Sequence, residues 1–214
     1  MRCFLFTVSL IVSSCIQKKG IHVQKGTVLQ KKTSIVCNYP LNKARCKKLY
    51  NDYKQFPELK KEMRFVNFLT DSLLPCWYGT KWNFYGTIEE PGKGTIACGY
   101  FVTTVLRDAG LSIQRVKLAQ CASEEMIRRV CDKPTIHRYR NVSLADFTRK
   151  IKNMGFGLYI AGLDNHTGFI FNDGVESYFI HSTYVKPGCV IKEKANESIV
   201  LAYSKYRVIG KVRL

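Results

Sequence analysis

The spacing of apolar residues changes near residue 155. Before this point, apolar residues recur three, four and seven positions apart, which predicts amphipathic helices. Three of these helices are expected around the following sets: Leu41, Leu49, Tyr53 and Phe56; Leu59, Met63, Val66, Leu69 and Leu73, after Pro57; and Phe101, Val102, Val105, Leu106 and Ala109, before Gly110.

Two further helices are expected in the same half of the chain. Residues 116–131 are interpreted as one helix around Met126, Ile127 and Val130. Ser143 and Asp146 have the spacing of a capping box, which predicts another helix directly after them.

From residue 155 onward, short apolar runs alternate with turn sequences. Six strands are expected, at 157–163, 167–171, 177–181, 189–193, 198–203 and 206–212, separated by turns such as Asn-Asp-Gly and Pro-Gly. Helices followed by an antiparallel sheet indicate an α+β fold. Residues 39–214 are therefore expected to form a single domain.

The N-terminal residues indicate export. Residues 1–14 are interpreted as a signal peptide, because an apolar run from Cys3 to Val12 follows Arg2 and is too short to span a bilayer. The run ends in Val-Ser-Ser-Cys, which resembles a bacterial lipoprotein signal with Cys15 as the lipidated residue, although an ordinary signal peptide is the alternative. Residues 15–38 carry lysines between glycines and glutamines and are expected to be a flexible basic tether.

The chain is strongly basic. It has 34 Lys and Arg against 16 Asp and Glu, a formal net charge of +18 over 214 residues. This charge favours anionic partners such as wall polymers or lipid head groups, although a lysine-rich soluble surface is the simpler explanation. Because the lysines are dispersed and form no recognised nucleic-acid motif, no nucleic-acid partner is expected.

Cys98 is the strongest candidate for chemistry. It follows a glycine-bearing turn and begins a predicted helix. The free amides and the positive dipole end of a helix are expected to lower the pKa of such a thiol. Two histidines in the strand-rich half, His166 and His181, are candidates for a base and for the residue that orients it.

Two segments resemble the NlpC-type cell-wall peptidases, which are papain-like enzymes and often lipoproteins. Residues 79–87, Gly-Thr-Lys-Trp-Asn-Phe-Tyr-Gly-Thr, followed by Ala-Cys98-Gly, are similar to the family's nucleophile block. His166-Thr-Gly-Phe-Ile-Phe, an Asn-Asp-Gly turn and Tyr-Phe-Ile-His181 resemble its histidine block. Together they cover about half of the chain.

The resemblance implies a role for each matched residue. Cys98 would attack a carbonyl carbon, His166 would act as the base, and His181 would orient His166 from the same sheet face. The family's tyrosine at the oxyanion site aligns with Trp82, with Tyr85 nearby. The loop between 86 and 98 is longer than usual, and Ala97 and Gly99 replace the family's Asp and Ser, so the substrate is less certain than the nucleophile.

Six of the nine cysteines have no assigned role, and an even number in an exported protein permits disulfides. Cys37 with Cys46 is a plausible local bridge. Cys121 and Cys131 would be nearly three turns apart on one unbroken helix and are poorly placed to pair. No metal-ligand spacing is present, so no metal site and no cofactor are expected.

The sequence therefore predicts a monomeric, lipid-anchored cysteine hydrolase of the bacterial cell envelope, held at the membrane through Cys15. Its expected substrate is an amide bond in the peptide part of peptidoglycan. Two alternatives remain: a papain-like acyltransferase or amidase acting on lipid or protein, and a non-catalytic basic envelope lipoprotein.

His137 is interpreted as a loop residue. A cluster of four arginines is interpreted as a solvated face, with contact to an anionic substrate as the alternative: Arg128, Arg129, Arg138 and Arg140.

Overall fold

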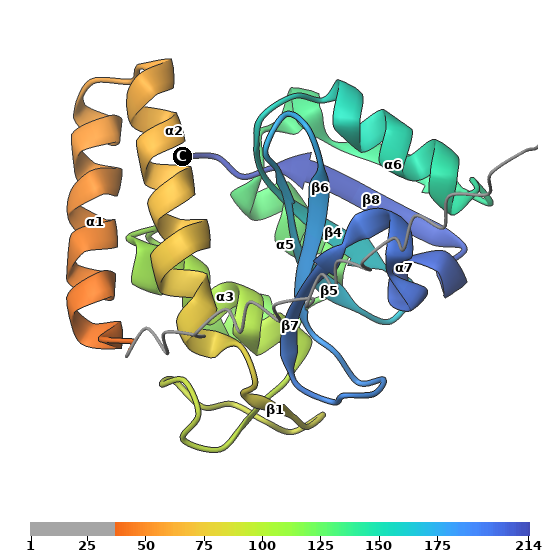
Figure 1. Ribbon diagram of the computed structural model, residues 1–214, viewed down its shortest axis with the longest axis horizontal. Helices are drawn as coiled ribbons and strands as arrows, with labels where there is room; N and C mark the ends of the chain where they lie inside the picture. Colours follow the sequence, from red (N-terminus) through yellow and green to blue (C-terminus); the bar gives the residue numbers. More distant parts are fainter. Residues whose placement is uncertain (1–36) are drawn as a thin grey trace, which may run out of the picture. The chain divides into compact units, whose positions relative to one another are not determined.

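The computed structural model describes residues 37–214. The signal peptide, Cys15 and most of the predicted tether lie outside this range. The described residues form a mixed α+β structure in which helices pack on both faces of an antiparallel sheet (Figure 1). The α+β prediction is therefore confirmed at this level.

The first two predicted helices are present and lie side by side (Figure 1). Helix α1 spans Tyr39–Gln55, and the Asn38 side chain caps it by accepting a hydrogen bond from the Leu41 amide at 3.1 Å. Helix α2 spans Leu59–Phe68 and continues through a π-helical turn, η1 (Leu69–Leu73), into a 3₁₀ turn, η2 (Leu74–Trp77). Its buried face starts at Phe65, whereas Leu59 at its beginning is exposed.

Helix α3 spans Cys98–Ala109, as the apolar spacing predicts. Gly110 ends it with φ = 118°, in the left-handed region that a side chain disfavours. The helix is buried along most of its length, and Phe101 packs edge-on against Trp77 and against Phe169 of the sheet. This packing fixes the position of its first residue, Cys98.

The prediction of one helix over residues 116–131 is wrong. Two short helices occur, α4 (Arg115–Ala119) and α5 (Ser123–Val130). The Ala119 carbonyl lies so close to Gly99 of α3 that any side chain at Gly99 would clash with it. The chain turns after this contact, which lets Met126 and Ile127 of α5 reach the core.

The capping-box prediction is confirmed, because Ser143 begins helix α6 (Leu144–Asn153) and accepts a hydrogen bond from the Asp146 amide at 3.1 Å. The predicted strand at 198–203 is wrong. Ser198 instead caps a short helix, α7 (Ile199–Tyr203), which buries Val200 and Leu201. Two 3₁₀ turns complete the helical elements: η3 (Lys133–Thr135) and η4 (Ala195–Glu197).

Six strands form the main sheet in the order β3-β8-β4-β5-β6-β7, and all neighbours are antiparallel. Five of them match predicted runs: β4 (Gly157–Leu163), β5 (Thr167–Asn172), β6 (Ser177–Ser182), β7 (Val190–Lys194) and β8 (Tyr206–Lys211). The sixth, β3 (His137–Arg140), contains His137, so the interpretation of this residue as part of a loop is wrong.

The two faces of the sheet contribute to different hydrophobic clusters. One face packs with α3 through residues such as Phe169 and Ile180, and the other packs with α6 and α7 through Ile170 and Phe179. Before α3, two very short strands, β1 (Lys81–Trp82) and β2 (Thr95–Ile96), pair in parallel and enclose a long loop.

Cys37 forms a disulfide with Cys76, so the predicted Cys37–Cys46 bridge is wrong. The bridge joins the beginning of α1 to η2, while Cys46 is a buried free thiol in the core of the helical layer.

Within residues 37–214, no helix is long and apolar enough to cross a membrane. The same residues contain no group of three or more His, Cys, Asp or Glu side chains arranged to hold a metal ion.

Candidate active site

Cys98 is the first residue of α3 and lies where that helix meets the sheet. The preceding residue, Ala97, has an extended backbone, and the Ser182 hydroxyl of β6 donates a hydrogen bond to the Ile96 carbonyl at 2.7 Å. Ser182 directly follows His181, so this bond fixes the start of α3 relative to the histidine strand. The sulfur is partly exposed in a cavity that His166 also lines.

Burial raises the pKa of the Cys98 thiol, although the amides of Thr167, Gly99 and Cys98 itself favour the thiolate. The expectation that the helix N-terminus lowers this pKa is therefore wrong in net effect, because desolvation outweighs the amides. The Cys98 thiol is therefore neutral, and a neutral thiol needs a base to become a nucleophile.

The pairing of β5 with β6 places the two histidines on the same face, as predicted. His166 directly precedes β5, and the register pairs Phe169 with Ile180. Gly168 is therefore opposite His181, and the His166 Nε2 atom lies 2.9 Å from His181 Nδ1. A methyl group on Gly168 would lie 2.7 Å from the His181 Cβ, which explains why this position needs glycine.

Glu193 of β7 extends this pair into a chain of three side chains. Its Oε1 atom lies 3.1 Å from His181 Nε2, and the register pairs Glu193 with Phe179. The Phe179 ring stacks on the His181 imidazole with a centroid distance of 4.0 Å, which holds the ring plane in place. Sequence reasoning missed Glu193, because only the pairing of β6 with β7 brings it to His181.

Both histidines are buried, and burial keeps them neutral. Desolvation, with a smaller contribution from His181, lowers the pKa of His166 to about 3. Desolvation also lowers the pKa of His181, although Glu193 acts in the opposite direction. Burial raises the pKa of Glu193, but its contacts with His181 and Ser198 outweigh this, so its pKa is lowered and the carboxylate is ionised.

These charge states determine which ring nitrogens carry protons. An ionised carboxylate only accepts hydrogen bonds, so neutral His181 must donate its Nε2–H to Glu193. His181 Nδ1 is then an acceptor, and it receives the Nε2–H of His166. The remaining nitrogen of His166, Nδ1, carries a lone pair and no proton. Through these contacts, Glu193 determines the tautomer of His166.

Two cavities meet at Cys98. Cys98 and His166 line both a cavity of about 570 Å³ and a second one of about 430 Å³. Trp82 and Tyr85, the predicted oxyanion or substrate-binding residues, both line the smaller cavity. Tyr85 is largely exposed at its rim, and the Trp82 ring packs near Tyr184 with centroids 6.1 Å apart. The structure therefore brings every predicted site residue in the described range to one region.

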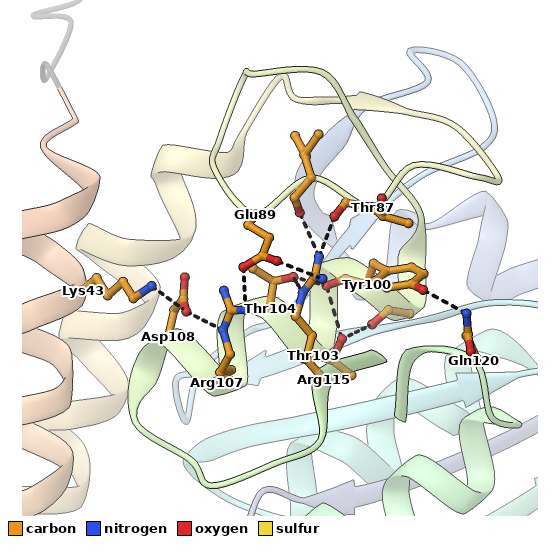
Figure 2. A network of polar contacts seen from close by, with 12 residues as sticks. Lys43, Thr87, Glu89, Tyr100, Thr103, Thr104, Arg107, Asp108, Arg115 and Gln120 are labelled. Atoms are coloured by element: carbon orange, nitrogen blue, oxygen red, sulfur yellow. Dashed lines mark hydrogen bonds and ion pairs between the residues drawn. The ribbon is translucent and has the colours of Figure 1, made fainter. Parts of the chain in front are cut away.

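Arg115 holds the loop that forms one side of the smaller cavity (Figure 2). Its guanidinium donates to the carbonyls of Thr87 and Ile88, at 2.7 and 3.0 Å, and to the Thr104 hydroxyl of α3 at 2.7 Å. It also lies over the Tyr100 ring at 4.9 Å. Arg115 therefore fixes the part of the loop that follows Tyr85 against α3.

The same network continues to the other end of α3. Arg107 bonds Glu89 of the loop at 2.7 Å and its neighbour Asp108 at 2.8 Å, and Lys43 of α1 bonds Asp108 at 2.9 Å (Figure 2). Burial raises the pKa of Asp108, but Arg107, Lys43 and Tyr39 outweigh it, so the carboxylate stays ionised. Every charge in this network faces an opposite charge.

The four arginines of the predicted cluster, Arg128, Arg129, Arg138 and Arg140, have different surroundings in the structure. Three of its members form ion pairs, Arg128 and Arg129 with Glu125 and Arg138 with Glu124. Arg140 lines the larger cavity instead, together with Cys98 and His166. Arg140 is exposed, as a solvated face requires, so its position agrees with both interpretations of the cluster.

The chain was also compared with known proteins. It matches no protein-family model, and the search of curated proteins found no match. The chemistry of the site must therefore be inferred from its own residues.

Proposed function

We propose that this protein is a cysteine hydrolase that cleaves an amide bond through a thioester on Cys98. The observation that carries the proposal is the chain from Glu193 through His181 to His166, which leaves Nδ1 of His166 unprotonated in a residue that lines the same cavity as Cys98. Among hydrolytic sites, a thiol with such an oriented imidazole is typical of nucleophilic acyl transfer.

In the first half of the reaction, His166 Nδ1 takes the proton of the Cys98 thiol as the sulfur attacks the carbonyl carbon. The new imidazolium is stabilised through His181 by the Glu193 carboxylate. The Cys98 backbone N–H and the Trp82 indole N–H are the candidate donors for the oxyanion. The C–N bond then breaks, and His166 returns its proton to the leaving amine, which leaves a thioester.

In the second half, water enters and His166 Nδ1 takes one of its protons. The resulting hydroxide attacks the thioester carbonyl, the C–S bond breaks, and the thiolate recovers the proton. The products are a carboxylic acid and the free Cys98 thiol. No cofactor takes part in either half of this mechanism.

We further propose a papain-like NlpC-type fold and a substrate in peptidoglycan stem peptides, with the protein anchored in the bacterial envelope through Cys15. The similarity of residues 79–99 and 166–181 to the family's two blocks supports this more specific proposal. The net charge of +18 suits an anionic wall polymer. A monomer satisfies the proposal, since all of the proposed catalytic residues come from one chain.

The test is digestion of purified sacculi, followed by mass spectrometry of the soluble muropeptides. Wild-type protein should release new peptides whose masses identify the bond, and Cys98→Ala should release none. Cys189→Ser is the matched control, because Cys189 is a free, half-buried thiol that lines neither cavity. Release by Cys98→Ala equal to that of wild type would exclude the mechanism. Transfer of an acyl group to an added amine or lipid, with the sacculi intact, would favour the acyltransferase alternative.

A further inference from the structure

The two cavities at Cys98 differ in their chemistry. The smaller one is lined by aromatic side chains that the larger one lacks, including Trp82, Tyr85 and Tyr184, whereas Phe84 lines both. The larger one is lined by charged side chains, including Glu124, Asp164 and Arg140. Because the nucleophile lies between them, the two parts of a substrate on either side of the scissile bond would meet different surroundings.

Both carboxylates of the larger cavity are already engaged by the protein. Glu124 accepts hydrogen bonds from the Tyr206 hydroxyl at 2.6 Å and from Arg138 Nε at 2.8 Å. Asp164 accepts from the Ser204 hydroxyl at 3.1 Å and from the amides of Lys205 and Tyr206, at 2.7 and 3.2 Å. These contacts lower the pKa of both carboxyl groups, so both are charged.

Arg140 has no comparable partner. Among residues 37–214 it makes no ion pair and no side-chain hydrogen bond, and its guanidinium lies over the Tyr206 ring at 4.5 Å. Tyr206 is its direct cross-strand neighbour, and the Tyr206 hydroxyl is held by Glu124. The ring therefore provides a fixed surface for the guanidinium plane, while the N–H groups at the edge of that plane stay available to a ligand.

We infer that Arg140 binds a carboxylate of the substrate within the larger cavity, on one side of the bond that Cys98 attacks. The inference rests on the proposed function, which supplies a peptide substrate. A planar, singly charged carboxylate matches the two parallel N–H donors of one guanidinium. A phosphate dianion fits less well, because the ionised Glu124 and Asp164 line the same cavity and would repel its second charge.

The test compares two synthetic stem tetrapeptides that differ in one group: a free α-carboxylate on the glutamate, or a carboxamide at the same place. Their binding to the Cys98→Ala protein is measured by calorimetry, and their kcat/KM is measured with wild-type enzyme. The carboxylate peptide should bind about 10- to 100-fold more tightly, as expected for a charge-assisted hydrogen-bonded pair. Arg140→Ala should remove this difference, and Arg140→Lys should restore part of it.

Arg128→Ala is the matched control, because it removes a cationic side chain that lies outside the cavity and pairs with Glu125. Equal affinity for the two peptides, no measurable binding of either, or a preference that persists in Arg140→Ala would each overturn the inference. Cleavage of both peptides at equal rates would leave the proposed hydrolase in place and exclude the Arg140 site. Discrimination in binding without any cleavage would support the Arg140 site and exclude the hydrolase.

Discussion

Two buried polar networks lie at the two ends of α3. At its C-terminal end, Asp108 is surrounded by Arg107, Lys43 and Tyr39, and it remains charged because cations face it. At its N-terminal end, Cys98 shares its cavities with His166, which is bonded to the buried His181, and all three titratable groups are neutral. Only Glu193, at the far end of that second network, carries a charge.

Under the proposed mechanism, this difference separates a structural network from a reactive one. A buried carboxylate that is fully paired with cations does not readily take up a proton, because neutralising it would leave those cations without a partner. A neutral thiol beside a neutral imidazole can exchange a proton without bringing a net charge into the site. The comparison predicts that mutations in the first network reduce stability and that mutations in the second reduce activity.

The largest effect is expected from His166→Gln. Without the base at Nδ1, the rate of amide cleavage should fall by about 10²- to 10⁴-fold, the usual contribution of general-base catalysis. The free energy of unfolding should change by less than about 1 kcal/mol, because Gln retains an N–H donor for His181. Steady-state kinetics and urea unfolding measure the two effects. His137→Gln is the control, since His137 is exposed on β3, and a similar loss of activity in both variants would contradict the assignment of the base.

The next effect should appear as a loss of stability. Asp108→Ala leaves Arg107 and Lys43 without their shared partner and removes the acceptor of the Tyr39 hydroxyl. The expected cost is about 3 kcal/mol, near the lower end for a broken buried pair because both cations are partly exposed.

In the same variant, kcat should be preserved, because the ten residues that separate Asp108 from Cys98 along α3 correspond to about 15 Å. Asp52→Ala, which removes an exposed aspartate of α1, should cost less than about 0.5 kcal/mol. Loss of kcat in folded Asp108→Ala protein would show that the two networks are coupled.

Glu193→Gln should have a smaller effect on catalysis than the loss of His166. The neutral amide can donate to His181 Nε2, which would reverse both tautomers and place a proton on His166 Nδ1. Activity should fall roughly 10- to 100-fold while the fold is retained, as is common for residues that orient a reactive group. Nitrogen chemical shifts of the histidines would report the tautomers directly. Unchanged shifts together with full activity would exclude Glu193 as the residue that orients the pair.

The last prediction concerns the dependence of stability on pH. The pKa of His166 is about 3 in the folded protein and near 6.5 when unfolded, so the unfolded chain binds more protons between these values. Stability should therefore fall as the pH decreases from about 6.5 toward 3, with a contribution approaching about 1.4 kcal/mol per pH unit from this residue. In a comparison of urea unfolding at several pH values, His166→Gln should show a weaker dependence. Parallel curves for the two proteins would contradict the burial of a neutral His166.

Much of the fold could be predicted from local patterns. The helix from Cys98 to Gly110, the cap at Ser143 and five of the six strands of the main sheet follow from periodicity and turn residues. The errors occur where short segments depend on distant partners. Residues 116–131 break into two helices because Ala119 packs on Gly99, and residues 198–203 form a helix because Ser198 caps it.

For the candidate site, the sequence by itself determined the types of the reacting groups and the spacing of His166 from Gly168 and His181. Such information is local, because a hairpin with a short turn fixes which residues face one another. The tertiary structure alone decided that Glu193 completes the pair, that Cys37 bonds Cys76, and that the thiol pKa is raised rather than lowered. These features depend on strand order and on burial by distant segments, and neither of them is encoded in the spacing of residues along the chain.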